Sequence, residues 1–165
     1  MHVRDERPED VETIHQMTDA AFALNPYSDG TEGWLIDELR ADGALTISLV
    51  AELDGEIVGH VAFSPVKIDG RDCGWFGLGP VCAKLGHMRK GIGSAVIRAG
   101  LDRLRSLNAA GCVLLGDPGY YCRFGFEHDP DLTYAGGPPE AFQRLVLSGP
   151  PVKGVVTFHP AFEAE

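Results

Sequence analysis

The chain has 165 residues, 44% of them hydrophobic, and a formal net charge of −10 from 24 acidic and 14 basic residues. These values predict one globular domain over residues 1–165, and the charge disfavours nucleic acid and anionic membranes as partners while attracting cations or amines. No apolar run approaches the roughly 18 residues of a membrane span and no signal peptide is recognisable, so we expect a cytoplasmic protein.

The four cysteines, Cys73, Cys82, Cys112 and Cys122, form no Cys-x-x-Cys pair and have no histidine at zinc-ligand spacing. We therefore expect free thiols in a reducing compartment and no structural metal. Cys82 differs from the others because it lies shortly before a basic, glycine-rich turn at residues 89–94.

The N-terminal quarter predicts a strand and two helices. Val3-Arg4 suggests the strand, and Pro8 with the two acids after it is typical of a helix N-terminus. Apolar residues recur at helical spacing from Val11 to Phe22, which predicts a core-facing helix. A loop at residues 25–30 and a second helix over 32–40 follow.

Antiparallel strands are expected next. Two β-rich runs, 46–52 and 56–64, flank Asp54-Gly55, a strong signal for a short hairpin. A third run covers 73–83, although its glycines and Pro80 weaken a central strand. A β-bulge and separation from the neighbouring strand would explain them and would leave backbone groups free to bind an extended ligand.

The second half predicts a parallel crossover. A helix begins at Gly93 with Gly111 as its expected stop, and a buried strand over 112–115 follows. A short aromatic helix should then end at Gly125. Two further strands are expected in the tail, at 142–147 and 154–158.

The turn before the long helix is basic and rich in glycine. Arg89-Lys90-Gly91-Ile92-Gly93-Ser94 places two cations and little side-chain bulk at a helix start, where free N–H groups and the helix dipole favour phosphate. The spacing matches neither a Walker loop, which needs Gly-Lys-Ser/Thr, nor the dinucleotide fingerprint, which needs a third glycine. An ordinary turn before a surface helix has a similar composition.

This turn resembles the pyrophosphate loop of the GCN5-related N-acetyltransferases (the GNAT superfamily), Gln/Arg-x-x-Gly-x-Gly/Ala, which binds coenzyme A. Met88 stands at the family's Gln/Arg position, so the cationic share rests on Arg89 and Lys90. The segment Tyr120-Tyr121-Cys122-Arg123-Phe124-Gly125-Phe126 is similar to the family's Phe/Tyr-Tyr-x-x-x-Gly-Phe ending. Over nearly its whole length the chain resembles a bacterial branch of this superfamily, the YhbS-like predicted acetyltransferases. The segments that carry this resemblance are Leu78-Gly79-Pro80-Val81, Gly116-Asp117-Pro118 and His159-Pro160-Ala161-Phe162.

The resemblance implies a GNAT fold of the α/β (α+β) type, with a mixed, mostly antiparallel central sheet, a splayed fourth strand and helices on both faces. It implies an acetyl-CoA-dependent N-acetyltransferase in which a primary amine, of a small molecule or a protein, attacks directly in a ternary complex. Tyr121 would be catalytic, beside the thioester sulfur. The implied cofactor-binding residues are Val81, Cys82, Ala83, Arg89, Lys90, Gly91, Ile92, Gly93 and Ser94, and no metal is implied.

Two other classes of function stay open. A non-catalytic coenzyme A-binding or regulatory module is favoured by Met88 and by the lack of any acid at 74–83 to act as general base. A protein-interaction domain would need no cofactor at all. His60, His87, Glu32 and Asp37 are base candidates, yet a core histidine or a solvated helix face explains such residues equally well. The sequence identifies neither the acceptor, nor the acyl length of the donor, nor whether the chain forms a homodimer.

Overall fold

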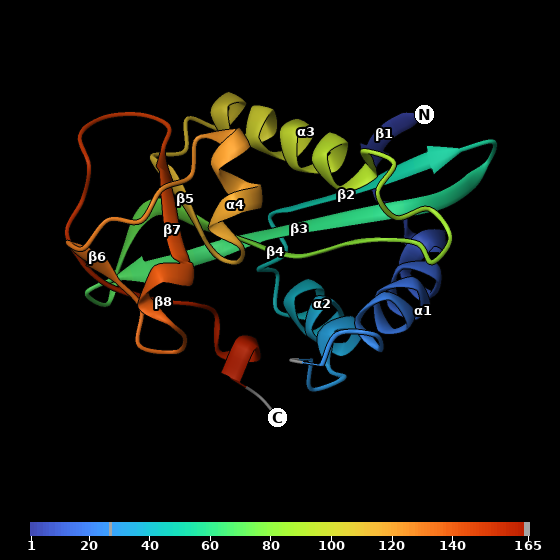
Figure 1. Ribbon diagram of the computed structural model, residues 1–165, viewed down its shortest axis with the longest axis horizontal. Coiled ribbons are helices and arrows are strands. Elements are labelled where there is room, and N and C mark those ends of the chain that lie inside the picture. The colour runs from blue at the N-terminus through green and yellow to red at the C-terminus, as the bar shows by residue number, and fades with distance from the viewer. Residues whose placement is uncertain (27, 164–165) are drawn as a thin grey trace.

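A mixed, mostly antiparallel sheet of eight strands forms the centre of the protein, as expected (Figure 1). The computed structural model describes residues 1–26 and 28–163, so Tyr27 of the expected loop at 25–30 lies outside the described residues. The main path of the sheet is β1 (His2–Asp5), β2 (Ile47–Leu53), β3 (Glu56–Ile68), β4 (Arg71–Ala83), β5 (Gly111–Leu115) and β7 (Phe142–Val146). Along it β4 and β5 pair parallel and the other neighbours antiparallel.

The hairpin between β2 and β3 has the predicted two-residue turn. Asp54 and Gly55 take φ values of 51° and 79°, and a turn with two positive φ angles matches the twist of the flanking strands. β3 continues four residues past its predicted end, because Pro65 falls at a register shift and the strand regains partners beyond it. Lys67 and Ile68 pair with β8 (Gly154–Thr157), which also pairs with β6 (Leu132–Thr133).

Helices cover both faces of the sheet, as expected. On one face lie α1 (Val11–Phe22), which follows a 3₁₀ turn at Pro8–Asp10, and α2 (Glu32–Ala41). The other face carries α3 (Ile92–Ser106) and α4 (Pro118–Tyr121) (Figure 1). Each pair buries its own apolar cluster against the strands, Val96, Leu101, Val61 and Phe63 on the α3 face and Ile14, Ile36 and Val50 on the α1 face.

The end of α3 differs from the sequence prediction. The helix stops at Ser106, and Asn108 takes the left-handed conformation with a φ of 59° that a helix terminus commonly needs. Gly111 instead opens β5, where a Cβ atom would lie 2.4 Å from the Trp75 ring. The glycine is therefore required by packing against Trp75, and the helix ends without it.

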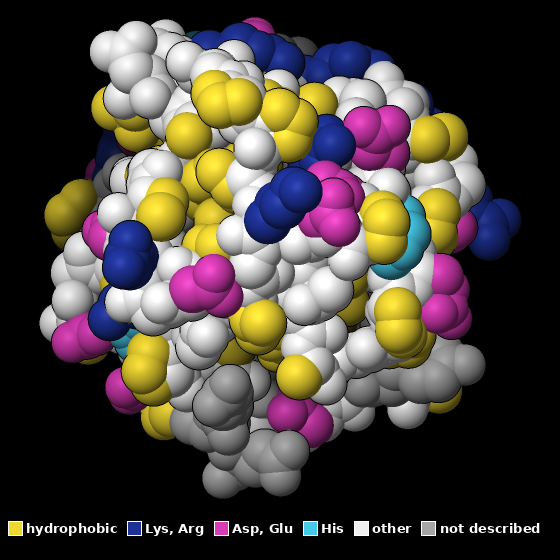
Figure 2. All heavy atoms as spheres, turned by 90° about the vertical axis from the view of Figure 1, so that its left-hand side faces the viewer, with side chains coloured by type: hydrophobic (Ala, Val, Ile, Leu, Met, Phe, Trp, Pro, Cys, Tyr) yellow, Lys and Arg dark blue, Asp and Glu magenta, His cyan; other side chains and the backbone are white. Residues whose placement is uncertain are grey.

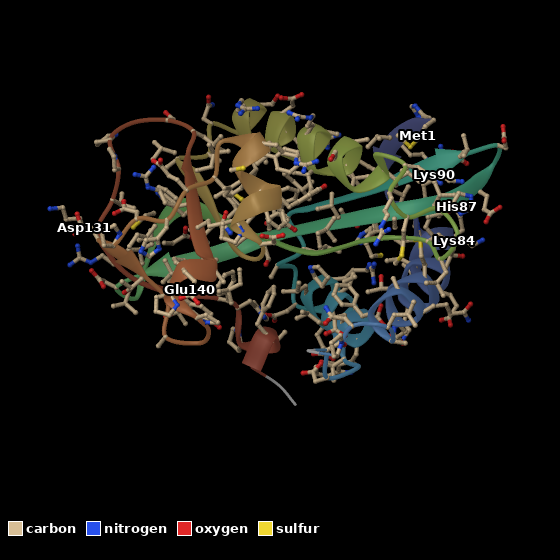
Figure 3. All side chains as sticks on the ribbon, in the orientation of Figure 1. Met1, Lys84, His87, Lys90, Asp131 and Glu140 are labelled. Atoms are coloured by element: carbon tan, nitrogen blue, oxygen red, sulfur yellow. The ribbon has the colours of Figure 1, made fainter. Side chains whose placement is uncertain are left out.

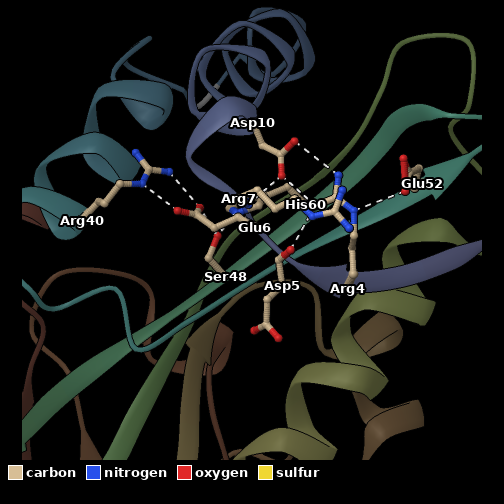
Figure 4. A network of polar contacts seen from close by, with 9 residues as sticks. All are labelled: Arg4, Asp5, Glu6, Arg7, Asp10, Arg40, Ser48, Glu52 and His60. Atoms are coloured by element: carbon tan, nitrogen blue, oxygen red, sulfur yellow. Dashed lines mark hydrogen bonds and ion pairs between the residues drawn. The ribbon is translucent and has the colours of Figure 1, made fainter.

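A buried polar network joins β1 and the start of α1 to the sheet and to α2 (Figure 4). His60 on β3 is fully buried, and its Nε2 lies 2.7 Å from the Ser48 hydroxyl. Ser48 donates in turn to the Glu6 carboxylate, which is paired with the Arg40 guanidinium at 2.8 Å. Because the Ser48 hydroxyl donates its hydrogen to Glu6, it can only accept from His60. His60 therefore donates from Nε2, and its imidazole is neutral.

Candidate functional site

β4 leaves its neighbour half-way along its length. It pairs with β5 only from Trp75 to Gly77, and from there on β3 is its one partner in the described part of the chain. Between Leu78 and Val81 the register with β3 shifts by one residue, which is a β-bulge at Gly79-Pro80. The bulged and splayed strand predicted for this segment is therefore confirmed.

The alternating directions of the N–H groups along β4 determine which amides face the edge that β5 leaves unpaired. The Lys84 N–H donates to the Val58 carbonyl of β3 at 2.8 Å. Because successive residues of a strand direct their N–H groups to opposite edges, the N–H groups of Ala83 and Val81 point away from β3. The Cys82 N–H points toward β3. Two backbone donors two residues apart thus line the open edge of β4.

A cleft of about 380 Å³ lies between the end of β4 and the end of α1. Its lining is mostly apolar and comprises Ala21, Phe22, Leu24, Asn25, Val81, Cys82, Ala83 and Met88. The Cys82 side chain packs toward α1, with Sγ 3.7 Å from the Thr18 hydroxyl. Burial raises the pKa of this thiol to about 11, so Cys82 stays protonated at neutral pH and is a wall of the cleft rather than a nucleophile.

The turn from β4 to α3 presents free donors. Gly91 is the N-cap of α3 with a φ of 78°, no side chain caps the helix, and the first intrahelical bond of the turn runs from the Ala95 N–H to the Gly91 carbonyl. The N–H groups of Ile92, Gly93 and Ser94 therefore precede the helical ladder. A Cβ atom placed on Gly91 would meet nothing within 4 Å, so the approach to these amides is open.

Cations surround this helix start. Figure 3 shows Lys84, His87 and Lys90 gathered around the turn at the end of β4. Lys84 is paired with Glu56. Arg89 and Lys90 are exposed and have no carboxylate partner in residues 1–26 and 28–163. The positive end of the α3 dipole and two unpaired cations thus make this the anion-attracting part of an acidic protein.

The aromatic block after β5 contacts the start of α3 directly. The Tyr120 hydroxyl lies 3.0 Å from the Ser94 hydroxyl. Tyr121 packs edge-to-face against Tyr120, with ring centroids 4.9 Å apart, and its ring covers Gly116, where a Cβ atom would lie 2.5 Å away. Burial raises the pKa of Tyr121 to about 12, so its phenol keeps its proton throughout the neutral range.

The structure brings the predicted residues together in two groups. Val81, Cys82 and Ala83 line the cleft, while Gly93 and Ser94 lie against the Tyr120 hydroxyl. Neither Tyr121 nor the two loop cations line the cleft. Sequence reasoning missed the end of α1 as the opposite wall, because its apolar spacing indicates only a core face. The hydrogen bond between Tyr120 and Ser94 was not predicted either, because nothing in the sequence indicates that their two helices meet.

None of the base candidates His60, His87, Glu32 and Asp37 lines the cleft. His60 is buried in the polar network, and Asp37 is bonded to His15 at 2.6 Å and to Arg40 at 3.0 Å. Glu32 accepts from the Ser28 hydroxyl at 2.5 Å. Within the described residues no carboxylate or histidine lines the cleft, no cluster of metal-ligating side chains occurs, and no helix has the length and apolarity to cross a membrane.

Comparison with known proteins decides the family. A family model described as an acetyltransferase (GNAT) domain matches residues 2–128, which include β4, the turn, α3 and the tyrosine block. The chain belongs to the GNAT acetyltransferase family. The uncharacterized N-acetyltransferase YhbS of Escherichia coli K12 is 38% identical over 152 residues, covering 86% of this chain and 89% of that protein.

Two solved GNAT structures share the whole architecture. A GNAT family acetyltransferase from Brucella melitensis, crystallised in complex with acetyl-CoA, is 48% identical with a TM-score of 0.88 and covers 98% of this chain and 97% of its own. YhbS from Escherichia coli in complex with CoA is 35% identical with a TM-score of 0.89, covering 99% and 92%. The GNAT fold and the resemblance to YhbS predicted from sequence are confirmed.

Proposed function

We propose that this GNAT protein transfers the acetyl group of acetyl-CoA to a primary amine of a small molecule or a protein. The observation that carries the proposal is the pairing of two donor sets in one place. The uncapped amides of α3 suit a diphosphate, and the open edge of β4 suits an extended amide-bearing arm. The relatives crystallised with acetyl-CoA and CoA support the same donor.

The residues present fit acetyl-CoA. Arg89 and Lys90 would hold the diphosphate together with the amides from Ile92 to Ser94, where the glycines leave room for close approach. The Val81 and Ala83 N–H groups would pair with the pantetheine arm as an adjacent strand would. When bound, acetyl-CoA supplies an acetyl group already activated as a thioester.

Tyr121 is proposed as the proton donor of the transfer. As the amine nitrogen bonds to the carbonyl carbon, the carbon–sulfur bond breaks, and the sulfur must gain a proton while the nitrogen loses one. The protonated phenol of Tyr121 would donate to this sulfur, and the proton lost by the nitrogen would pass through solvent to restore the phenol. Burial raises the pKa of this phenol to about 12, so it still carries its proton at neutral pH when the thiolate forms. Holding both reactants in one complex would supply much of the acceleration.

A non-catalytic module that binds coenzyme A is the second candidate. It is favoured by one observation: no side chain able to accept a proton from an ammonium group lines the cleft in the described residues. An alkylamine with a pKa near ~10 is mostly protonated at neutral pH, so catalysis would require solvent or an amine bound in its neutral form.

The test is release of free CoA thiol from acetyl-CoA over a panel of primary amines, followed with a thiol reagent. Acetyltransferase activity predicts amine-dependent release by the wild-type protein and a loss of about 10²-fold or more in turnover for Tyr121→Phe. CoA affinity measured by calorimetry should be unchanged in that variant. Tyr134→Phe, which removes a phenol elsewhere in the chain, is the matched control. CoA binding without thiol release from any amine would favour the regulatory module, and unchanged turnover in Tyr121→Phe would remove the phenol from the mechanism.

A further inference from the structure

Two arginines, Arg98 of α3 and Arg123 just after α4, lie where α3 faces the aromatic block of residues 120–124, and we call this line of contact the seam. Both arginines lack acidic partners. Several arginines elsewhere are paired with carboxylates: Arg4, Arg40, Arg103, Arg105 and Arg144. Arg98 and Arg123 have no carboxylate within salt-bridge distance in the described part of the chain. They lie over aromatic rings instead, with Cζ of Arg98 4.9 Å from the Phe124 centroid and Cζ of Arg123 4.2 Å from the Tyr120 centroid.

One aromatic pair holds both guanidinium groups. The Tyr120 and Phe124 rings pack edge-to-face with centroids 5.6 Å apart. Stacking on a ring face limits the freedom of each arginine and leaves its edge N–H groups available. Arg123 is further fixed because its Nε donates to the Tyr120 carbonyl at 2.8 Å, which keeps its terminal N–H groups for a ligand.

The seam begins at the proposed diphosphate subsite. Ser94 and Arg98 are one helical turn apart on α3, so they share the stripe that faces the aromatic block. Ser94 meets the Tyr120 hydroxyl at 3.0 Å, and Arg98 meets the next ring along. Figure 2, turned about the vertical axis, shows Lys and Arg side chains gathered along the upper edge of the molecule, the level at which α3 lies in Figure 1.

We propose that Arg98 and Arg123 bind the 3′-phosphate of coenzyme A. The inference rests on the proposed function, since it requires the diphosphate to occupy the first turn of α3. Coenzyme A carries one further phosphate, a monoester on the neighbouring ribose with a charge near −2, and guanidinium groups pair with such phosphates through two parallel hydrogen bonds. On a chain with a net charge of −10, unpaired arginines at this place provide the local attraction that a phosphate monoester needs.

The probe is dephospho-CoA, which lacks only the 3′-phosphate. Affinities of CoA and dephospho-CoA are measured by calorimetry for the wild type, Arg98→Gln, Arg123→Gln and the control Arg105→Gln, an exposed arginine of α3 already paired with Asp102. The wild type should prefer CoA by about ten-fold or more, as expected for charge-assisted hydrogen bonds to a phosphate. Arg123→Gln should lose most of this preference by weakening CoA binding alone, Arg98→Gln should lose part of it, and Arg105→Gln none.

The outcomes separate this inference from the proposed function. A wild-type protein that binds neither ligand contradicts the proposed function. Equal affinity for CoA and dephospho-CoA overturns the arginine assignment and leaves the proposed function standing. A preference that survives in both glutamine variants also overturns it. Equal weakening of the two ligands in Arg123→Gln leaves the preference for CoA intact and overturns the role of Arg123, because the arginine then only supports the local fold. If the assignment is right, Arg123→Lys, which keeps the charge, retains part of the preference that Arg123→Gln loses.

Discussion

His60 should make the stability of the protein depend on pH between 7 and 4. Burial lowers the pKa of this imidazole from 6.5 to about 4, although the Glu6 carboxylate acts in the opposite direction. In the unfolded chain the same group binds its proton near pH 6.5. Stability contributed by the neutral imidazole is therefore complete above pH 6.5 and is lost as the pH falls toward 4, because the unfolded state then binds the extra proton.

The size of the effect follows from the two pKa values. Linkage of a group with pKa values of 6.5 and about 4 predicts that the free energy of unfolding falls by about 2 kcal/mol between pH 7.5 and pH 5 from His60 alone. His15 opposes this change, because its hydrogen bond to Asp37 raises its pKa and protonation at low pH stabilises the fold. A comparison of variants is needed to isolate His60.

Urea unfolding followed by tryptophan fluorescence at several pH values provides the measurement. His60→Gln keeps a donor for the Ser48 hydroxyl but cannot titrate, so its unfolding free energy should depend less on pH than that of the wild type. The gap between the two proteins should change by about 2 kcal/mol between pH 7.5 and 5. His2→Gln, at an exposed position, should keep the wild-type dependence. If the free energies of unfolding of the wild type and His60→Gln change in parallel between pH 7.5 and 5, His60 is not the source of the pH dependence.

Three further substitutions test the site and the core. Gly93→Val places a branched side chain where phosphate must approach the first turn of α3, so CoA affinity in calorimetry should fall about ten-fold or more; an unchanged affinity would move the diphosphate elsewhere. Tyr120→Phe removes the hydroxyl that bonds Ser94, and thermal melts should show a loss of about 1 kcal/mol together with weaker CoA binding. Gly100→Ala puts a Cβ atom 2.2 Å from the Phe63 ring and should destabilise the fold by about 1–3 kcal/mol, which a variant with wild-type unfolding would contradict.

Local chemistry made several elements predictable. Asp54-Gly55 encodes its own hairpin turn, and Gly125 ends the aromatic block with a φ of 96° that few other residues adopt easily. The glycines and Pro80 of β4 indicate a bulge because regular pairing tolerates them badly. In each case residues close in sequence determine the outcome.

Elements that depend on distant partners could not be read in this way. Lys67 and Ile68 pair with β4 across the local Asp69-Gly70 turn, but they also pair with β8, close to the C-terminus, which the sequence around Pro65 does not indicate. Gly111 leaves room for the Trp75 ring. A glycine at the expected end of a helix does not reveal that its reason is a contact with a residue 36 positions earlier. The site divides similarly: the glycine turn could be predicted from its own residues, whereas the hydrogen bond between Tyr120 and Ser94 joins two helices that only the folded sheet brings together.

The one-residue bulge at Gly79-Pro80 works as a phase switch along β4. Before it, Phe76 and Leu78 turn their side chains to the α3 layer, whereas after it the odd-numbered Val81 and Ala83 do so. Removal of one residue here would let Leu78 and Val81 pair with Phe63 and Val61 in an unbroken ladder. The faces of Val81 and Ala83 would be kept, but the bend that a bulge gives to its strand would be lost, and with it the separation that opens this edge. Recognition at this edge is accordingly encoded by the spacing of the backbone, and side chains could drift through evolution without erasing it, provided that the count of residues is kept.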